Sequence, residues 1–450
     1  MDFCKKFLVA GSGISGIGAA KLLLAKGAQV VLYDGNEKLD EKTLLANFDK
    51  DAKISVALGQ LSSELAHEVD LCVISPGIPL TVPFVEVLKE AGVPIWSEIE
   101  LAYQAAQGRL AAITGTNGKT TTTALVGEIF KNAYEHAFTV GNIGIPYTKE
   151  ALNMKEDAVT VIECSSFQLE TIVDFKPQVS AILNITPDHL DRHKTMDNYA
   201  AIKENITKNQ DKDGACVLNY EDERLREFGE NLQIPVIFFS SMRKLDKGIF
   251  LDGEQIILKT DKETIPFVKT SELNIIGRHN YENAMAAIAV AYAMGVPVEV
   301  INKTLREFKA VEHRIEFVEE KNGVVYYNDS KGTNPDAAIK AIDAMTRPTV
   351  LIAGGYDKKS DYTEWIESFN GKVKTMLLMG VTGPKIEQTA NKLGFTNCEY
   401  VESMEEAVKR AASLTEPGDA VLLSPACASW GMFKNYEERG RIFKECVRAL

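Results

Sequence analysis

A glycine-rich stretch carries the clearest chemistry in the sequence. It follows the apolar run 110–113 and consists of Gly115, Thr116, Asn117, Gly118, Lys119, Thr120 and Thr121. Glycines let backbone N–H groups close around phosphate oxygens, and a helix N-terminus, which we expect to begin at Thr122, adds partial positive charge. Lys119 supplies a full charge and the Thr120 hydroxyl can reach Mg²⁺. The stretch predicts a nucleotide-phosphate loop and, as first hypothesis, ATP or GTP hydrolysis.

The spacing of this loop departs from the general G-x-x-x-x-G-K-[ST] rule, because Ile113 stands five residues before Gly118. We interpret the shorter spacing as a subfamily variant. The alternative is a glycine turn that only caps an ordinary helix.

Glu163 follows the strand expected at 158–162, at the strand end where open α/β sheets place ligands. Mg²⁺ that faces phosphates needs one or two protein oxygens, which Thr120 and Glu163 would supply. The alternative is that Glu163 caps the helix that follows.

The segment 184–193 gathers two of the six histidines, two aspartates and an arginine directly after a strand. Imidazole can join a metal site or bind a substrate oxygen, and His189 is our candidate. Asp188 and Asp191 alternatively only form the turn. Further along, Asn280 and Asn283 share a helix face and could bind an adenine edge, although either could be a helix cap.

Three loops follow strand ends in the last third of the chain, and the first of them combines basic and acidic residues. They are 328–335, which holds Asp329 and Lys331, 354–359, and 424–430. The loop 328–335 suits a transferred phosphate and ribose, and the other two loops can meet a second substrate. Alternatively, any single lysine there is a solvated surface residue.

A second glycine motif, Gly11-Ser12-Gly13-Ile14-Ser15-Gly16, lies between a strand and a helix, and Asp34 closes the next strand. This arrangement meets the conditions for an NAD site. The loop binds only a pyrophosphate and Asp34 offers only a hydrogen bond, so a UDP group fits equally. Alternatively the glycines serve helix–strand packing alone.

The elements that position these residues alternate as in α/β proteins. We expect strands at 6–10, 29–33, 54–58, 70–74, 158–162, 179–184, 324–327, 349–352, 375–379 and 420–423, a helix-rich stretch at 276–294, and surface hairpins before it. A chain of 450 residues is longer than one that folds around a single hydrophobic core, so two or three domains are expected.

Composition narrows the function classes. With 45% hydrophobic and 25% charged residues the chain is globular, and a net charge of −13 argues against general affinity for nucleic acid or anionic membrane. Seven scattered cysteines without a C-x-x-C pair, and no export signal or apolar span, favour a reducing cytoplasm.

Together these motifs resemble the Mur ligase family in order and over the whole length. The segments concerned are 115–121, 163–169, 184–192, 277–283, 312–314 and 329–335, and within the family 141–144, 424–429 and 433–440 resemble the branch that adds D-glutamate. The resemblance implies a monomeric, cytoplasmic α/β enzyme of peptidoglycan synthesis with UDP-N-acetylmuramoyl-L-alanine, D-glutamate, ATP and Mg²⁺ as ligands. It implies a Rossmann-like domain (1–97) for UDP, a P-loop ATPase-like domain (98–310) for ATP, and a Rossmann-like domain (311–450) for the amino acid, with domain closure.

The resemblance also assigns roles residue by residue. For the UDP substrate these are Ser15, Asp34, Ser75, Gly77, Asn142 and His189; for ATP, the loop 115–121 with Asn280, Asn283, Arg314 and Asp329; for D-glutamate, Thr333, Lys358, Ser429 and Tyr436; for Mg²⁺, Thr120, Glu163, His189 and Lys203; and for catalysis, Lys119, His189, Lys203 and Lys331. Lys203 would be carbamylated, with Lys208 as the alternative. Tyr436 stands where the family sometimes has phenylalanine.

Three other functions fit parts of the pattern. Another amino-acid ligase of the same architecture, such as a folylpolyglutamate synthetase or the L-alanine-adding enzyme, would share most motifs. An NAD-dependent dehydrogenase is supported by residues 11–34 alone, and a nucleotide-gated binding protein by the phosphate loop alone.

Overall fold

The structure is a computed structural model that describes residues 2–142, 144–357 and 359–450. It divides into two compact units, which we describe separately. The first comprises Met1–Lys269 and Asn283–Leu305, and the second comprises Thr270–Glu282 and Arg306–Leu450. In the described part, no helix is long and apolar enough to span a membrane.

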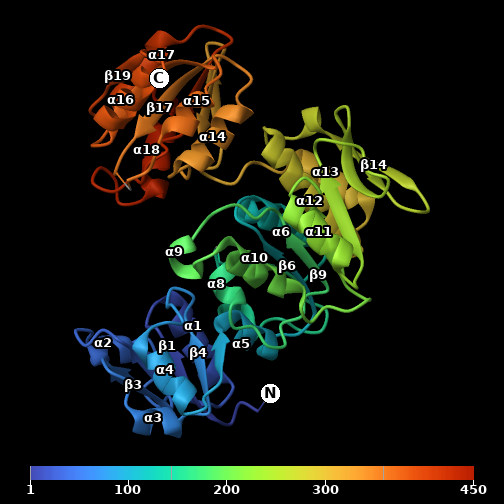
Figure 1. Ribbon diagram of the computed structural model, residues 1–450, viewed down its shortest axis with the longest axis vertical. Helices are drawn as coiled ribbons and strands as arrows, with labels where there is room; N and C mark the ends of the chain where they lie inside the picture. Colours follow the sequence, from blue (N-terminus) through green and yellow to red (C-terminus); the bar gives the residue numbers. More distant parts are fainter. Residues whose placement is uncertain (1, 143, 358) are drawn as a thin grey trace. The chain divides into compact units, whose positions relative to one another are not determined.

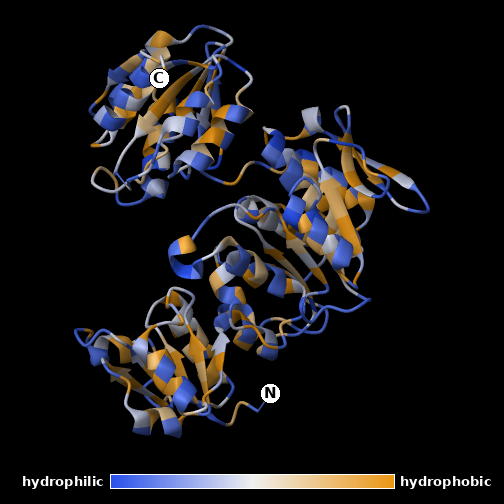
Figure 2. Cartoon of the chain, in the orientation of Figure 1, coloured by the Kyte–Doolittle hydropathy of each residue, from blue (hydrophilic) through white to orange (hydrophobic). Residues whose placement is uncertain are grey.

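A five-stranded parallel sheet opens the first unit, in the order β3-β2-β1-β4-β5 (Figure 1). Its strands are β1 (Lys6–Ala10), β2 (Gln29–Asp34), β3 (Ile54–Leu58), β4 (Leu71–Ile74) and β5 (Ile95–Ser97). Its helices are α1 (Ile14–Ala25), α2 (Glu41–Leu45), α3 (Ser63–Glu68) and α4 (Pro83–Glu90). Because the central strands are buried on both faces, they read as continuous apolar runs, which Figure 2 shows in orange.

The second sheet has nine strands in the order β14-β13-β12-β11-β10-β9-β6-β8-β7. They are β6 (Arg109–Thr114), β7 (Ala137–Gly141), β8 (Val159–Glu163), β9 (Val179–Ile182), β10 (Ala215–Asn219), β11 (Val236–Ser240), β12 (Gly248–Asp252), β13 (Gln255–Lys259) and β14 (Thr264–Lys269). The pairing is parallel except between β12, β13 and β14, which confirms the predicted hairpins.

The helices around this sheet carry part of the predicted site, including Lys119 on α6 and Lys203 on α10. They are α5 (Glu98–Ala105), α6 (Lys119–Ala133), α7 (Tyr147–Glu150), α8 (Ser166–Leu169), α9 (Leu190–His193), α10 (Met196–Glu204) and α11 (Glu223–Asn231), with a 3-10 turn at Asn205–Thr207. Most of α12 (Arg278–Ala293) and of α13 (Val298–Glu307) also falls in the first unit, whereas the 3-10 turn at Thr270–Glu272 belongs to the second unit. The prediction that the helix after the phosphate loop begins at Thr122 was wrong, because α6 begins at Lys119. Gly118, with φ of 84°, turns the chain directly into the helix.

The second unit holds a six-stranded sheet in the order β15-β16-β20-β17-β18-β19, parallel except between β15 and β16. Its strands are β15 (Glu316–Lys321), β16 (Val324–Asn328), β17 (Thr349–Gly354), β18 (Val373–Met379), β19 (Cys398–Tyr400) and β20 (Ala420–Leu423). Its helices are α14 (Pro335–Ala344), α15 (Thr363–Glu367), α16 (Gly383–Lys392), α17 (Met404–Leu414) and α18 (Tyr436–Arg448). The predicted α/β class is confirmed, and each sheet falls inside one predicted domain, whose exact limits stay predictions.

The turn from β1 into α1 depends on the absence of a side chain at Gly16. A Cβ there would lie 1.8 Å from the Gly11 carbonyl oxygen, whereas one at Gly13 would meet nothing within 4 Å. The fingerprint glycine at position 16 therefore serves close packing of the loop on the helix.

We predict that Gly16→Ala lowers the free energy of unfolding by about 2–3 kcal/mol, because the backbone must move to remove the clash. Gly13→Ala, the matched control, should cost less than about 1 kcal/mol. Urea-induced unfolding followed by circular dichroism measures both, and equal losses in the two variants would contradict this account.

Candidate active site

The phosphate loop spans the end of β6 and the start of α6. Gly115 and Gly118 both have positive φ, of 148° and 84°, which only glycine adopts without strain. The Lys119 ammonium donates hydrogen bonds to the carbonyl oxygens of Gly115 and Thr116, each at 2.8 Å. These bonds hold the charge of Lys119 against the loop and beside the N-terminus of α6, a position that favours anions.

The chain after β9 fixes the shape of this loop. Asn184 accepts a hydrogen bond from the Asn117 N–H at 2.8 Å and donates one to the Asn117 carbonyl at 3.1 Å. The Thr116 hydroxyl donates to the carbonyl of Thr186 and accepts from its N–H, at 3.1 and 3.0 Å. The segment beginning at residue 184 thus positions the phosphate loop.

Asn283 of α12 packs directly on the loop. It accepts a hydrogen bond from the Thr122 hydroxyl at 3.3 Å, and a Cβ on Gly118 would lie 2.3 Å from its Oδ1 atom. Asn280, one turn earlier, donates to the Ile276 carbonyl at 2.7 Å. Both asparagines lie inside the helix, so neither is its N-cap.

Lys203 reaches the same loop from α10. Lys203 is buried, with an exposed fraction of 1%. Its ammonium donates a hydrogen bond to the Gly115 carbonyl at 2.8 Å and lies 4.7 Å from the centre of the Tyr199 ring. Burial, reinforced by the nearby positive charge of Lys119, lowers the pKa of Lys203 well below its usual value. The alternative lysine, Lys208, instead contacts the Ile172 carbonyl.

Glu163 is the last residue of β8 and is buried. Its Oε1 atom accepts a hydrogen bond from the Asn142 side chain at 2.9 Å, and its Oε2 atom has no hydrogen-bond partner in the described part of the chain. Ser165 caps α8 through a capping box with Gln168, so Glu163 is not the cap. A buried carboxylate oxygen aimed at no protein donor suits a bound cation.

The two histidines at the ends of α9, His189 before it and His193 as its last residue, differ in their surroundings. His189, the residue before α9, has φ of 52° and a side chain 50% exposed, with its ring 4.9 Å from that of Phe167. His193 is buried, and its Nε2 atom lies 2.9 Å from the Ser166 hydroxyl. Burial, followed by the charge of Arg192, lowers the pKa of His193 to about 4.

The predicted metal ligands are only partly assembled. Thr120, Glu163 and Lys203 lie around the phosphate loop. The His189 ring instead contacts the ring of Phe167. Among residues 2–142, 144–357 and 359–450 no group of three or more His, Cys, Asp or Glu side chains could hold a metal.

The glycine motif that begins at Gly11 lines a cavity of about 1080 Å³. Its lining includes Ser15, Asp34, Ser75 and Gly77, all predicted from the sequence, but not Asn142, which lies beside Glu163. Asp34 accepts hydrogen bonds from the N–H and hydroxyl of Ser12, at 3.1 and 2.6 Å. The Ser75 hydroxyl is buried and has no hydrogen-bond partner within the described residues.

The second unit gathers most of the remaining predicted residues at the ends of β16 and β20. The Asp329 carboxyl accepts from the Ser424 hydroxyl at 2.7 Å, and burial raises its pKa to about 7 despite this bond and the nearby Arg314. Lys331 lies 5.4 Å from the centre of the Tyr436 ring. Thr333 follows on the same loop, Ser429 is buried on the loop after β20, and Lys358 lies outside the described residues.

Sequence reasoning did not single out Arg439, which joins these two loops. Its buried guanidinium donates to the hydroxyl and carbonyl of Ser330, at 3.0 and 2.8 Å, and to the Cys427 carbonyl at 3.2 Å. Burial lowers its pKa to about 10, so it remains charged at neutral pH. The signal available in the sequence was its place in the segment 433–440.

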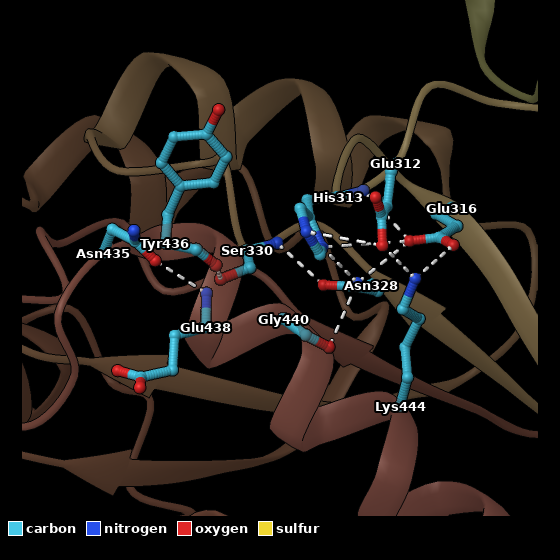
Figure 3. Close-up of polar contacts among 10 residues, drawn as sticks. All are labelled: Glu312, His313, Glu316, Asn328, Ser330, Asn435, Tyr436, Glu438, Gly440 and Lys444. Carbon is cyan, nitrogen blue, oxygen red and sulfur yellow. Dashed lines mark hydrogen bonds and ion pairs between the residues drawn. The ribbon is translucent and has the colours of Figure 1, made fainter.

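A network of polar side chains adjoins these loops, as Figure 3 shows. Asn328 at the end of β16 lies 2.9 Å from His313 Nδ1, donates to Glu316 at 3.0 Å, and accepts from the Ser330 N–H at 3.1 Å. Lys444 of α18 donates to Glu312 and Glu316, at 2.6 and 2.9 Å. The network ties α18, which begins at Tyr436, to β16, the strand that Asp329 directly follows.

Family models cover most of the chain. Residues 5–97 match the Mur ligase MurD-like N-terminal domain, residues 113–291 the Mur ligase middle domain, and residues 313–427 the Mur ligase glutamate ligase domain.

Close relatives match the chain from end to end. Proteins named UDP-N-acetylmuramoylalanine–D-glutamate ligase are 53% identical in Lachnoclostridium phytofermentans, covering 99% of this chain and 98% of the relative, and 44% identical in Clostridioides difficile, covering 99% of both. Among solved structures, the MurF ligase from Thermotoga maritima in complex with ADP covers 100% of both chains with a TM-score of 0.60 at 17% identity. A pseudomurein peptide ligase type C from Methanothermus fervidus covers 99% of both with a TM-score of 0.59 at 19% identity. These two structures support the fold.

The lowered pKa of His193 predicts a dependence of stability on pH. The unfolded chain binds a proton near pH 6.5 and the folded chain only near pH 4, so stability falls as pH falls through this window. His193→Gln should reduce that loss by about 1–3 kcal/mol, measured by urea unfolding at pH 7 and pH 4.5. The exposed His67→Gln should leave the loss unchanged, and an unchanged loss in His193→Gln would refute the assignment.

Proposed function

The chain belongs to the Mur ligase family, and from this premise we propose that it is the ATP-dependent ligase that joins D-glutamate to UDP-N-acetylmuramoyl-L-alanine, forming ADP and phosphate in peptidoglycan precursor synthesis. The observation that carries the proposal is identity of 44–53% to D-glutamate ligases over 99% of the chain. The dehydrogenase alternative loses its support, because only residues 11–34 favoured it and those residues lie within the part that matches the Mur ligase MurD-like N-terminal domain. We also propose that the enzyme works in the cytoplasm.

ATP is proposed to bind with its phosphates on the loop 115–121. The positive-φ glycines, the ammonium of Lys119 and the N-terminus of α6 all favour anionic oxygens there. Asn280 and Asn283 are proposed to bind adenine, and Arg314 and Asp329 the rest of the nucleotide.

Mg²⁺ is implied by the family, and the residues present fit it. Glu163 offers a buried carboxylate oxygen without a hydrogen-bond partner in the described part, and Thr120 offers a hydroxyl at the start of α6. His189 and a carbamylated Lys203 are proposed for a second ion. When bound, Mg²⁺ supplies positive charge to phosphate oxygens.

The UDP substrate is proposed to bind in the cavity lined by Ser15, Asp34, Ser75 and Gly77. The glycine loop at the start of α1 suits a pyrophosphate, and the Ser75 hydroxyl is an available donor. Asn142, held by Glu163, and His189 are proposed to contact the substrate nearer the phosphate loop.

The reaction is proposed to proceed in two steps. A carboxylate oxygen of the alanyl group forms a bond to the γ-phosphorus of ATP while the bond to ADP breaks, giving an acyl phosphate. The amine of D-glutamate then attacks the acyl carbon, phosphate leaves and the amine loses a proton. Lys119 and Lys331 stabilise the spreading phosphate charge, and Thr333, Lys358, Ser429 and Tyr436 are proposed to hold D-glutamate.

The direct test is ADP formation with purified protein. We predict turnover only when UDP-N-acetylmuramoyl-L-alanine and D-glutamate are both present, and no turnover with L-alanine in place of D-glutamate. Lys119→Ala should reduce kcat/KM by at least about 10³-fold, since it removes charge from the transition state. Lys131→Ala, on the exposed face of the same helix, is the matched control. Turnover with another amino acid, or near-normal ADP release by Lys119→Ala, would contradict the proposal.

Carbamylation of Lys203 is proposed because only a neutral amine reacts with CO2, and the lowered pKa of Lys203 increases the neutral fraction at neutral pH. Lys203→Ala should lose at least about 100-fold in kcat and regain part of it with added short carboxylates such as acetate or propionate. Lys208→Ala is the control and should retain activity. Loss and rescue in Lys208→Ala instead would move the ligand to that position.

A further inference from the structure

Arg192 of α9 contacts two parts of the first unit that are far apart in the sequence. Its guanidinium donates to the carbonyl oxygens of Pro76 and Ile78, at 2.7 and 3.1 Å, and to Glu170 at 2.7 Å. The guanidinium carbon also lies 4.0 Å from the centre of the Phe167 ring. One side chain therefore joins the loop after β4 to α8 and to Glu170, the C-cap of that helix.

Both ends of this connection border the proposed substrate site. Pro76 and Ile78 line the large cavity that holds Asp34 and Ser15. Gly77 and Pro79 line that cavity and also a second one, of about 390 Å³, together with Phe167, His189 and Arg192. The loop after β4 is thus shared by the two cavities.

The contact between Phe167 and His189 extends the connection to a proposed substrate ligand. The Phe167 ring lies 4.9 Å from the His189 ring and 5.3 Å from the His193 ring. Arg192 covers Phe167, so its placement restricts where the His189 ring can lie. His189 itself has a left-handed backbone, a conformation that neighbouring contacts must hold.

The chemistry of these contacts requires arginine. A planar guanidinium can donate to two carbonyls and a carboxylate at once while one face rests on an aromatic ring, whereas a lysine ammonium is a compact point charge. The Arg192 and Glu170 side chains are only 13% and 11% exposed, so the charges compensate each other with little help from water. Glu170 Oε1 also lies 3.4 Å from His193 Nδ1.

We propose that Arg192 is a positioning residue. It holds the loop 75–79, which lines the nucleotide cavity, at a fixed position relative to His189. This inference rests on the proposed function, because it assigns the two cavities to one substrate. Arg192 aligns the UDP portion, bound in the large cavity, with the muramoyl-alanyl portion, which extends past His189 toward the phosphate loop.

The test compares Arg192→Lys with Arg224→Lys, an arginine that pairs with Asp197 and Glu204 away from both cavities. Calorimetry measures the Kd of UDP, which occupies only the large cavity, and of UDP-N-acetylmuramoyl-L-alanine, which spans both. Arg192→Lys should raise the Kd of the full substrate on the order of tenfold and the Kd of UDP by less than about twofold. The KM for the full substrate should rise while the KM for ATP stays unchanged, and Arg224→Lys should alter none of these values.

Hydrogen exchange decides the inference even if the proposed function fails. Arg192→Lys should speed amide exchange in both 75–82 and 186–194, whereas exchange unchanged in either segment would overturn the proposal. Equal weakening of UDP and of the full substrate, or a lower thermal midpoint with unchanged Kd values, would also overturn it by making Arg192 a support of one pocket or of the fold. If the wild-type protein binds UDP and UDP-N-acetylmuramoyl-L-alanine with equal affinity, the proposed function fails. The hydrogen-exchange result alone then tests the positioning role of Arg192.

Discussion

Two lysine ammonium groups share one carbonyl oxygen, that of Gly115, and the rest of the site is arranged around this crowding of positive charge. Lys119 reaches it from the start of α6 and Lys203 from the buried side of α10. The crowding and burial favour the neutral form of Lys203 and favour anions at the loop. Glu163, with an oxygen that no described residue binds, adds an acidic group close by, so the region suits phosphates and a cation together.

The strand order of each sheet explains why the functional residues meet at strand ends. β6 lies between β9 and β8, so the phosphate loop, the segment from Asn184 and Glu163 emerge at one edge. In the second unit β16 and β20 are neighbours, which brings Asp329 beside Ser424. Parallel sheets place ligands at their carboxyl ends for this geometric reason, and the loops there differ in chemistry while the strands supply a common scaffold.

The sequence predicted the fold class, ten of the strands to within two residues of their observed ends, and the glycine-rich turn from a strand into a helix at residues 115–121, because these depend on local patterns. It placed the start of α6 three residues late, since a glycine in a left-handed conformation can begin a helix at once. It could not predict the roles of Arg192 and Arg439, because their partners Pro76 and Ser330 lie 116 and 109 residues away in the chain. The sequence analysis chose His189 as the candidate, but the difference in environment between buried His193 and exposed His189 depends on packing that the sequence does not show.

The central claim is that phosphates held by residues 115–121 activate the substrate carboxylate. UDP-N-acetylmuramoyl-L-alanine labelled with ¹⁸O in both carboxylate oxygens tests it in one turnover. If the carboxylate attacks the γ-phosphorus and phosphate then leaves the acyl carbon, one labelled oxygen must appear in the released phosphate and the other must remain in the new amide. Phosphate that carries no label, together with normal amide formation, would contradict the account.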